Sequence, residues 1–495
     1  MLLILNNHDY RYAVEQIMLI LFPGEKPEHT ETGQANRAVS TLSLGKTWAT
    51  ARTNLTWQGE EAVGVSRVRC DRLTDALTRD RLLQRIVKQS FYKAAVAATG
   101  IIPDWGALTG IRPAKLASKA LKGGQSEAQV RRLFQREFFV SPERTSLALE
   151  AARASLACEA ELRADELSLY VGIPFCPTRC AYCSFVSADV GRALKLVEPY
   201  LDALEREIDA VADYLRRANS HIRTLYIGGG TPTTLSAPQL ERLIGRLRQR
   251  LDLRRLTEFT VEAGRPDTIT AEKMAVLRAA GVDRVSVNPQ SMRDEVLAAM
   301  GRAHTAEDIL RAYEIVRAAG IPIVNLDLIA GLPRDNLAGF RATLDAVLAL
   351  DPENITVHTL ALKKGARLML EREGLPSGAE TAAMLDYARE KLTAASFRPY
   401  YLYRQKYMSG ALENIGWCKR GTEGIYNICI MEELHTILAL GAGGSTKLTD
   451  PETGRIVRLT NPKYPQQYIE RIDSLCAEKS ALVDFQLGLQ QRRQH

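Results

Sequence analysis

The sequence of 495 residues has only eight cysteines, a small net charge and no apolar run of the roughly 18 residues that a membrane span needs. Hydrophobic residues make up 46% and charged residues 25% of the chain, a composition too apolar for intrinsic disorder. Met1–Leu5 is apolar, but His8, Asp9 and Arg11 follow at once, so we expect a buried first strand and not a secretion signal. We therefore expect a cytoplasmic protein, and its length predicts more than one domain.

Most of the net charge of +7 lies in residues 1–165. This excess can attract nucleic acid or another anionic partner. It can equally be the solvated face of a helix, because basic and apolar side chains share a helical spacing in one stretch. The basic members are Arg72, Arg79, Arg81, Arg85 and Lys88, and the apolar ones are Leu73, Leu77, Leu83 and Val87. We favour the solvated face, since blocks of charge are commonly just solvated.

Short apolar strands alternate with amphipathic helices between residues 166 and 365, which predicts a parallel sheet with right-handed crossovers. The predicted strands are Leu167–Pro174, Thr224–Gly229, Glu258–Gly264, Arg284–Gln290, Pro322–Gly331 and Asn354–Ala361. The predicted helices are Lys195–Leu215, Ala237–Leu251, Ala271–Ala280, Ala306–Ala319 and Leu337–Leu350. Six strands are too few for a full eight-stranded barrel, so we expect an α/β fold with an open, partial (β/α)6 TIM-like barrel.

The flanking segments differ from this core. Residues 1–165 combine strand patterns with helical ones, which predicts an N-terminal α+β domain. Its strands are expected at Leu2–Leu5 and within Ala38–Arg69, and its helices at Tyr12–Leu21, Leu73–Ala98, Gln125–Phe139 and Ser146–Ala164. Residues 366–495 become helical and then rich in tyrosine and glycine, which predicts a mainly helical C-terminal domain.

Three of the cysteines, Cys176, Cys180 and Cys183, lie close together just after the first strand of the core. Closely spaced thiols in a reducing compartment suggest a metal before a disulfide. A zinc site usually takes four nitrogen or sulfur ligands in paired spacings, and no partnering pair is evident nearby. A cubane iron–sulfur cluster held by only three thiolates has one iron open to a substrate. The C-x3-C-x2-C spacing therefore favours an iron–sulfur metal centre over buried thiols or a structural zinc site.

The stretch Tyr170-Val-Gly-Ile-Pro-Phe-Cys176, with its continuation through Cys183-Ser-Phe185, resembles the signature of the radical S-adenosylmethionine (SAM) superfamily. Within it, the likeness is to the oxygen-independent coproporphyrinogen III oxidase family, and it covers roughly residues 167–450. The long N-terminal domain and Gly172 suggest the HemZ-type coproporphyrinogen dehydrogenase branch. The resemblance implies a [4Fe-4S] cluster on the three cysteines and SAM as cofactors. It also implies a porphyrinogen or haem ligand, a reducing electron donor such as flavodoxin or ferredoxin, and a C-terminal region that covers the substrate.

The resemblance assigns further residues to SAM. Tyr170, Gly229 and Glu262 match contacts to a first SAM molecule. The positions that match a paired, second SAM site are Tyr182, Gly230, Thr231, Gln290, Arg302, Asp327 and Ala361. The candidate catalytic residues are Tyr170, Glu262 and Asp327.

Three of these segments also have a physical interpretation. Gly228–Pro232 ends the second strand, and its glycines would let the backbone approach a ligand, although a tight turn would need them too. Glu262 ends the third strand, where a carboxylate can hold ribose or amino groups or can cap a helix. Asp327 lies within an apolar strand, where an unpaired acid would be costly, so it needs either a ligand or a basic partner.

Other groups of residues outside the SAM contacts have weaker signals. The small residues of Gly441–Ser445 favour a close approach of the backbone to a ligand over a simple turn. Four tyrosines favour a half-buried strand over a wall for a flat macrocycle, namely Tyr400, Tyr401, Tyr403 and Tyr407. Three histidines lack ligand spacing and favour single hydrogen-bonded roles, namely His304, His358 and His435. Cys418 and Cys429 are too few for a second cluster, and we expect them to be buried.

Two positions depart from the family pattern, because the resembled oxidases usually carry a histidine at the position of Gly172 and a fourth cysteine at that of Phe185. Three functions therefore compete. The leading one is oxidative decarboxylation of coproporphyrinogen III propionates to vinyl groups, giving protoporphyrinogen IX in haem biosynthesis. The second is a haem-binding chaperone of the same family. The third is a radical SAM enzyme acting on tRNA, prompted by the basic first third, but no RNA-binding module is recognised there and we do not expect nucleic acid as a partner.

Overall fold

The computed structural model describes the chain except residues 31–34, 184–187, 190–192, 362–373, 406–407 and 495. The chain divides into two compact units. Unit 1 comprises Met1–Pro113, Lys119–Leu149 and Arg404–Leu412, and unit 2 comprises Ala114–Ser118, Glu150–Tyr403 and Glu413–His495. The three predicted domains, with boundaries at 165 and 365, divide the chain differently and stay predictions.

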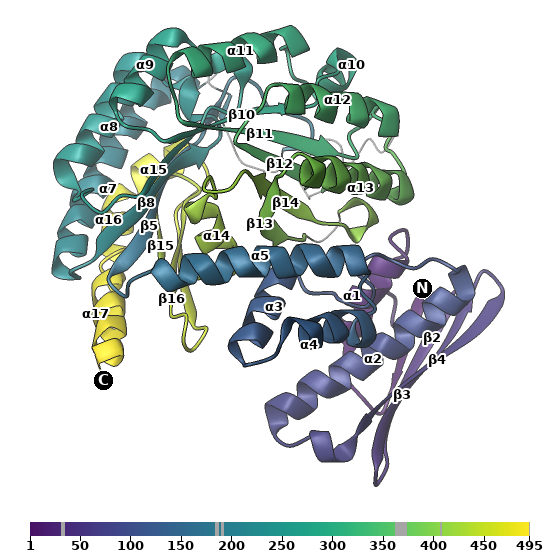
Figure 1. Ribbon diagram of the computed structural model, residues 1–495. Helices are drawn as coiled ribbons and strands as arrows, with labels where there is room; N and C mark the ends of the chain where they lie inside the picture. The colour runs from purple at the N-terminus through teal and green to yellow at the C-terminus, as the bar shows by residue number, and fades with distance from the viewer. Residues whose placement is uncertain (31–34, 184–187, 190–192, 362–373, 406–407, 495) are drawn as a thin grey trace. The chain divides into compact units, whose positions relative to one another are not determined.

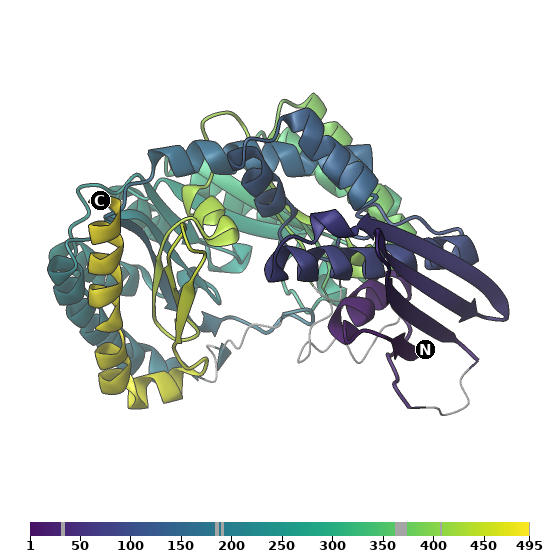
Figure 2. The same cartoon turned by 90° about the horizontal axis from the view of Figure 1, so that it is seen from below.

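Unit 1 contains a four-stranded sheet in the order β1-β2-β3-β4, in which β1 is parallel to β2 and the other pairs are antiparallel. Its strands are β1 (Leu2–Asn6), β2 (Arg37–Leu44), β3 (Trp48–Trp57) and β4 (Glu60–Arg69), and its helices are α1 (Arg11–Leu21), α2 (Ala76–Thr99) and α4 (Glu127–Arg132). Helix α2 packs on β3 and β4 and against α1 (Figure 2). Two more helices have residues in both units, α3 (Pro113–Lys122) and α5 (Pro142–Glu161).

Unit 2 is built on an eleven-stranded sheet in the order β13-β14-β12-β11-β10-β9-β8-β5-β15-β16-β17. The parallel core strands are β5 (Glu166–Ile173), β8 (His221–Gly229), β9 (Glu258–Glu262), β10 (Arg284–Gln290), β11 (Ile323–Ala330) and β12 (Asn354–Thr359). Since β13 and β17 form opposite edges, the described strands make an open sheet, which confirms the predicted partial barrel. A separate short pair is formed by β6 (Phe175–Cys176) and β7 (Ala188–Asp189).

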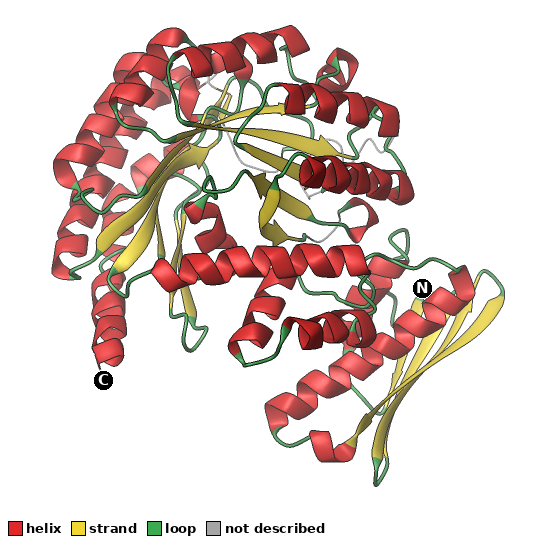
Figure 3. Ribbon diagram, in the orientation of Figure 1, coloured by secondary structure: helices red, strands yellow, loops and turns green. Residues whose placement is uncertain are grey.

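Helices lie along the outer side of the core strands (Figures 1 and 3). They are α7 (Val197–Arg217), α8 (Ala237–Arg250), α9 (Ala271–Ala279), α10 (Asp294–Ala299), α11 (Ala306–Ala318) and α12 (Leu337–Ala349). The helix starts follow local chemistry, since Ser236 and Gln239 form a reciprocal cap at the N-terminus of α8. The helix ends do too: Gly281 and Gly320 follow α9 and α11 with φ of 64° and 74°. Both glycine stops agree with the predicted helix ends.

The segment after residue 373 has the predicted helices, and it also adds strands at both edges of the sheet. The helices are α13 (Gly378–Ala394), α14 (Ile425–Glu432), α15 (Pro465–Glu470), α16 (Ile472–Glu478) and α17 (Ala481–Gln494). The strands are β13 (Arg398–Tyr403), β14 (Asn414–Cys418), β15 (Ile437–Leu440), β16 (Ser445–Thr449) and β17 (Ile456–Thr460). Strand β15 pairs in parallel with β5, so residues near 440 lie beside the first core strand. No helix in the described part of the chain is long and apolar enough to cross a membrane.

Candidate active site

A group of tyrosines and acids lies on the core strands. Tyr170 of β5 stacks on Tyr226 of β8 with 6.1 Å between ring centroids, and Tyr226 stacks on Tyr426 of α14 at 4.3 Å. The Tyr226 hydroxyl donates to Glu262 Oε1 over 2.5 Å. Parallel strands present alternate side chains on one face, which brings residues distant in sequence together there. The sequence analysis named Tyr170 and Glu262 but missed Tyr226 and Tyr426.

Glu262, at the end of β9, titrates near neutrality. Burial raises its pKa to about 7, with a further contribution from the charge of Asp327, although hydrogen bonds from Tyr226 and the Gly229 N–H oppose the rise. Glu262 therefore exchanges a proton close to neutral pH, which suits a group that binds an ammonium or hydroxyl or transfers a proton.

Asp327, in β11, has protein partners. Asn325 Nδ2 donates to Asp327 Oδ1 over 2.7 Å, and His358 Nε2 of β12 lies 3.6 Å from Oδ2. Burial raises the pKa of Asp327, but the contacts from His358, Asn325 and Thr356 outweigh burial and hold the pKa below its ordinary value. Asp327 thus has the basic neighbour that one alternative requires, and its carboxylate lies close enough to Glu262 to affect that group's pKa.

The end of β10 carries buried acceptors without protein partners. Gln290 is 5% exposed and has a φ of 68°, an unusual backbone conformation for a residue other than glycine. Its Oε1 and the Oδ1 of Asn288 have no hydrogen-bond partner among the described residues. Buried acceptors of this kind are costly unless a donor reaches them, so they fit a ligand rich in N–H and O–H groups.

Arg302 connects this strand end to the cysteine loop, which we define as residues 176–183. One Nη of Arg302 donates to the carbonyl of Asn288 over 2.6 Å, and the other donates to the Tyr182 hydroxyl over 3.1 Å. Arg302 is buried, and its charge also interacts with Cys180. The structure therefore brings together three of the predicted residues, Tyr182, Arg302 and Cys180.

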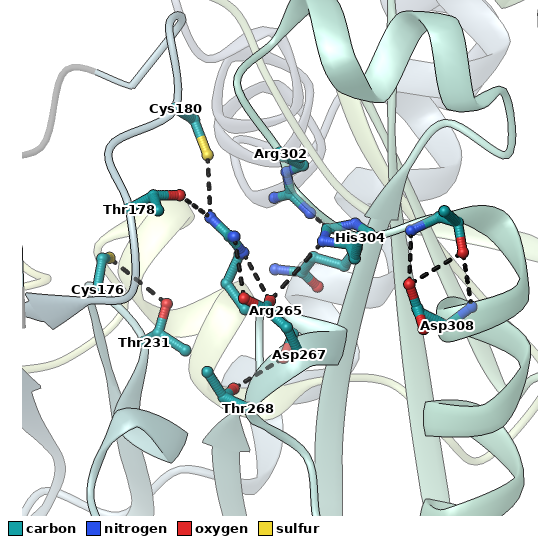
Figure 4. A network of polar contacts seen from close by, with 12 residues as sticks. Cys176, Thr178, Cys180, Thr231, Arg265, Asp267, Thr268, Arg302, His304 and Asp308 are labelled. Carbon is teal, nitrogen blue, oxygen red and sulfur yellow. Dashed lines mark hydrogen bonds and ion pairs between the residues drawn. The ribbon is translucent and has the colours of Figure 1, made fainter. Parts of the chain in front are cut away.

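The cysteine loop starts at the end of β6 and has all three thiols half-buried. Cys176 Sγ lies 3.4 Å from the Thr231 hydroxyl, and Arg265 Nη1 donates to Cys180 Sγ over 3.7 Å (Figure 4). Across the described residues, no three His, Cys, Asp or Glu side chains are already arranged to hold a metal ion. The donor set nevertheless fits an iron–sulfur cluster, since it offers three soft thiol ligands on one loop with polar donors facing the sulfurs.

The glycine turn after β8 packs tightly against this loop. A Cβ on Gly230 would lie 3.0 Å from Cys176 Sγ and 2.5 Å from a backbone oxygen of β6. The Gly229 N–H donates to Glu262 Oε2 over 3.3 Å, and those of Gly230 and Thr231 donate to backbone carbonyls. Glycine is thus required at position 230 for packing within the protein. Because the N–H groups of residues 229–231 already have protein acceptors, only the carbonyl groups and side chains of this turn are available to contact a ligand.

Of the two positions that depart from the family pattern, only Gly172 lies among the described residues. Gly172 lies against the β15–β16 turn: a Cβ there would be 2.9 Å from the carbonyl oxygen of Ala442. The same turn brings Gly441 so close that its Cβ would be 2.3 Å from the Gly172 oxygen. The small residues of Gly441–Ser445 therefore pack on the chain itself, and their approach to a ligand stays a prediction. Phe185 lies outside the described residues.

The remaining predicted residues have ordinary surroundings. Tyr400, Tyr401 and Tyr403 lie in the predicted strand, β13, although Tyr400 and Tyr401 are buried and not half-buried. Tyr407 lies outside the described residues. Cys418 and Cys429 are buried, also as predicted. His435 Nε2 lies 2.8 Å from the Ser168 hydroxyl, which agrees with a hydrogen-bonded role. The buried His304 differs from that prediction, since its Nδ1 lies 3.7 Å from Asp267 Oδ1 and neither ring nitrogen has a hydrogen bond among the described residues. Ala361, two residues past β12, is half-buried, and its predicted contact to SAM stays a prediction.

Arg265 is the charged residue of this region that the sequence analysis missed. It follows Glu262 by three residues, is 3% exposed and contacts the cysteine loop. A signal existed, since an arginine directly after a strand of the predicted barrel lies at the end where such folds place their sites.

Comparison with known proteins identifies the family. Residues 170–347 match the family model of the radical SAM superfamily. The chain is 40% identical over 388 residues to the oxygen-independent coproporphyrinogen-III oxidase-like protein HemZ of Bacillus subtilis, and the match covers 77% of each chain. It is 30% identical over 305 residues to the heme chaperone HemW of Escherichia coli, covering 61% of this chain and 76% of HemW.

Among solved structures, the coproporphyrinogen III oxidase HemN from Escherichia coli, described as a radical SAM enzyme, matches with a TM-score of 0.52 and 25% identity. That match covers 66% of this chain and 73% of HemN. The chain therefore belongs to the radical SAM superfamily, with a [4Fe-4S] cluster and SAM as its cofactors, and within it to the family of oxygen-independent coproporphyrinogen-III oxidase-like proteins.

Proposed function

We propose that this protein catalyses the oxygen-independent oxidative decarboxylation of coproporphyrinogen III. Each of two propionates loses a hydrogen atom to the SAM-derived radical, CO2, and one electron to a separate electron acceptor, and becomes a vinyl group. The observation that carries the proposal is the placement of the cysteine loop beside buried acceptors and a near-neutral Glu262 on one set of strands. The likeness to HemZ and to HemN supports the substrate class.

In this proposal Cys176, Cys180 and Cys183 hold the cluster. When bound, the cluster and SAM supply a 5′-deoxyadenosyl radical. Tyr170, Gly229 and Glu262 contact the first SAM molecule. A second SAM molecule is held by Tyr182, Gly230, Thr231, Gln290, Arg302, Asp327 and Ala361. A flavodoxin or ferredoxin supplies electrons, and the protein works in the cytoplasm, where thiols stay reduced.

The chain's own residues have definable tasks in the proposed reaction. Glu262, with a pKa of about 7, accepts or keeps a proton at neutral pH while it holds a donor group of the bound SAM. The orphaned oxygens of Gln290 and Asn288 orient the hydroxyl and amino groups of a ligand. The stacked tyrosines exclude water from this side of the strands.

A haem-binding chaperone is the second candidate, because the chain is 30% identical to HemW across 76% of that protein and has Gly172 where the resembled oxidases have histidine. One anaerobic experiment compares the two functions. Reconstituted protein is given coproporphyrinogen III, SAM and a reductant, and CO2 is measured; a parallel sample is titrated with haem and followed by absorption. CO2 release that is lost in Cys180→Ala supports the decarboxylase, and stoichiometric haem binding without CO2 release supports the chaperone.

The second SAM molecule is tested at Asp327. If Asp327 contacts it, Asp327→Asn should keep the cluster and lower the SAM stoichiometry from two toward one, because a charge-assisted contact of about 1.5–3 kcal/mol is lost. Equilibrium dialysis with labelled SAM and a thermal melt measure the two effects. Unchanged stoichiometry together with a lower melting temperature would assign Asp327 a structural role with His358.

A further inference from the structure

Arg265 is a buried cation clamped in one orientation. It lies between β9 and the short turn at Pro266–Thr268 and is 3% exposed. Its Nε and Nη2 donate to the two carboxylate oxygens of Asp267 over 3.0 and 3.1 Å. Such a two-pronged pair fixes the plane of the guanidinium group as well as its position. The direction of the third nitrogen is therefore set by the protein.

That third nitrogen points at the cysteine loop. Nη1 donates to the Thr178 hydroxyl over 3.0 Å and to Cys180 Sγ over 3.7 Å, so one group contacts two residues of the loop (Figure 4). The carboxylate on the other side of Arg265 does not stand alone, because His304 lies 3.7 Å from Asp267. Arg302 adds a second buried cation whose charge acts on Cys180. Two buried guanidinium groups therefore act on this one thiol.

If the role of Arg265 were only to form a salt bridge with Asp267, its Nη1 contacts to Thr178 and Cys180 would have no explanation. A buried guanidinium is costly unless each edge has a partner, and among the described residues the edge away from Asp267 is satisfied by Thr178 and Cys180 of the cysteine loop. A donor to a cluster thiolate stabilises added negative charge, and hydrogen bonds to the sulfurs are among the factors that set the potential of iron–sulfur clusters. Arg265 thus has the position and the chemistry to act on a cluster held at Cys180.

We propose that Arg265 is a positioning residue that holds the Thr178–Cys180 segment in its cluster-binding conformation and, through its hydrogen bond to Cys180 Sγ, raises the reduction potential of the cluster. The inference rests on the proposed role of Cys180 as a cluster ligand. It adds a residue that acts on the cluster through that ligand.

The test replaces Arg265 with Met, which keeps the volume and removes the donors and the charge. Wild type, Arg265→Met and the control Arg278→Met, an exposed arginine of α9, are reconstituted anaerobically without SAM. Iron and sulfide content, circular dichroism and the midpoint potential from an EPR-monitored titration are measured. We expect the control to match wild type and Arg265→Met to have a more negative midpoint potential.

Each result has a definite meaning. An Arg265→Met protein that folds and binds iron with an unchanged midpoint potential overturns the inference. A folded variant that has lost its iron supports the holding role. If Arg265→Met does not fold, Arg265→Lys retains the charge beside Asp267 but lacks the directed Nη1 donor, and it must have a smaller shift in the same direction. If Cys180→Ala keeps the full iron content, Cys180 is not a cluster ligand. That failure of the proposed function can be told apart from a failure of the inference about Arg265, because it is measured in a protein whose Arg265 is unchanged.

Discussion

Among single residues, Glu262 is the acid whose protonation links the site to pH. Its surroundings raise the pKa to about 7, from an ordinary value of 4.5. Because the folded protein binds this proton more tightly than the unfolded chain, the stabilising effect is complete below pH 4.5 and is lost as the pH rises through about 7.

We predict that Glu262→Gln removes this pH dependence. The free energy of unfolding of wild type, relative to the variant, should fall by about 3 kcal/mol between pH 4.5 and pH 7.5, since one pKa unit corresponds to about 1.36 kcal/mol. Denaturant unfolding of the cluster-free proteins at several pH values measures it. Parallel curves for the two proteins would show that Glu262 titrates at its ordinary pKa.

Gly172 is a second residue at which adding a single atom, the Cβ of any other amino acid, is expected to change the stability of the protein. A Cβ there would meet the Ala442 oxygen at 2.9 Å and the Leu440 oxygen at 3.4 Å, and both are backbone atoms that cannot rotate away. We predict that Gly172→Ala destabilises the protein by about 1–3 kcal/mol, the usual cost of overpacking.

The matched control for Gly172 is Gly245→Ala in α8, where a Cβ would meet nothing within 4 Å. That substitution should be neutral or stabilise the helix by up to about 1 kcal/mol. Denaturant midpoints of both variants measure the difference. Equal midpoints would mean that the β15–β16 turn moves aside at no cost.

At the scale of elements, the cysteine loop lies between β6 and β7, and residues that follow β8, β9 and β10 contact it. Thr231 follows β8, Arg265 follows β9, and the Asn288 carbonyl that Arg302 binds lies in β10. The loop is therefore placed by tertiary contacts to its side chains and by a backbone hydrogen bond from the Ala181 N–H to the Met300 carbonyl over 3.0 Å.

We predict that alanine at Cys176, Cys180 or Cys183 abolishes cluster binding and reductive SAM cleavage. Wild type should bind about four irons and four sulfides per chain after anaerobic reconstitution, as a cubane requires. Cys418→Ala should keep them, because Cys418 is buried in β14 and donates to the Arg398 carbonyl. Iron and sulfide analysis decides the matter, and equal iron loss in Cys418→Ala and Cys180→Ala would refute the three-thiol assignment.

At the scale of the whole molecule, a buried ion pair ties the C-terminal helices of unit 2 to its core. Lys479 Nζ lies 2.8 Å from Glu207 Oε1, and the side chains are 1% and 0% exposed. Glu207 also accepts from the Gly441 N–H, from Tyr468 and from Asn461. One carboxylate thus joins α7, the β15–β16 turn and the segment before α17.

We predict that Lys479→Met destabilises the protein by about 3–5 kcal/mol, because the charge of Glu207 loses its buried partner. Lys391→Met is the control: its ion pair with Asp345 spans 3.9 Å at a half-exposed site, and its loss should cost no more than about 1 kcal/mol. Chemical denaturation measures both. A Lys479→Met protein as stable as the control would mean that the hydrogen bonds alone satisfy Glu207.

Much of the core was predictable because its signals are local. The strand Arg284–Gln290 has the predicted bounds, and the other predicted core strands and helices differ by a few residues at their ends, although the short helix α10 was missed. Apolar runs buried on both faces, capping residues and a glycine at a helix end all act within a few residues of the chain. The cysteine spacing is equally local, so the metal centre was predictable as a type of site.

Only the tertiary structure decided which residues surround that site. The placement of β15 beside β5, which fills the space next to Gly172, depends on pairing between segments some 270 residues apart, and such pairing leaves no local pattern. Tyr226, Tyr426 and Arg265 join the site because the fold packs α14 on β8 and places the turn after β9 beside the cysteine loop. The sequence by itself determined the helices and strands and the chemistry of the thiols. The near-neutral pKa of Glu262 and the hydrogen bond from Arg265 to Cys180 were decided by the tertiary structure, because burial and long-range contacts exist only in the folded chain.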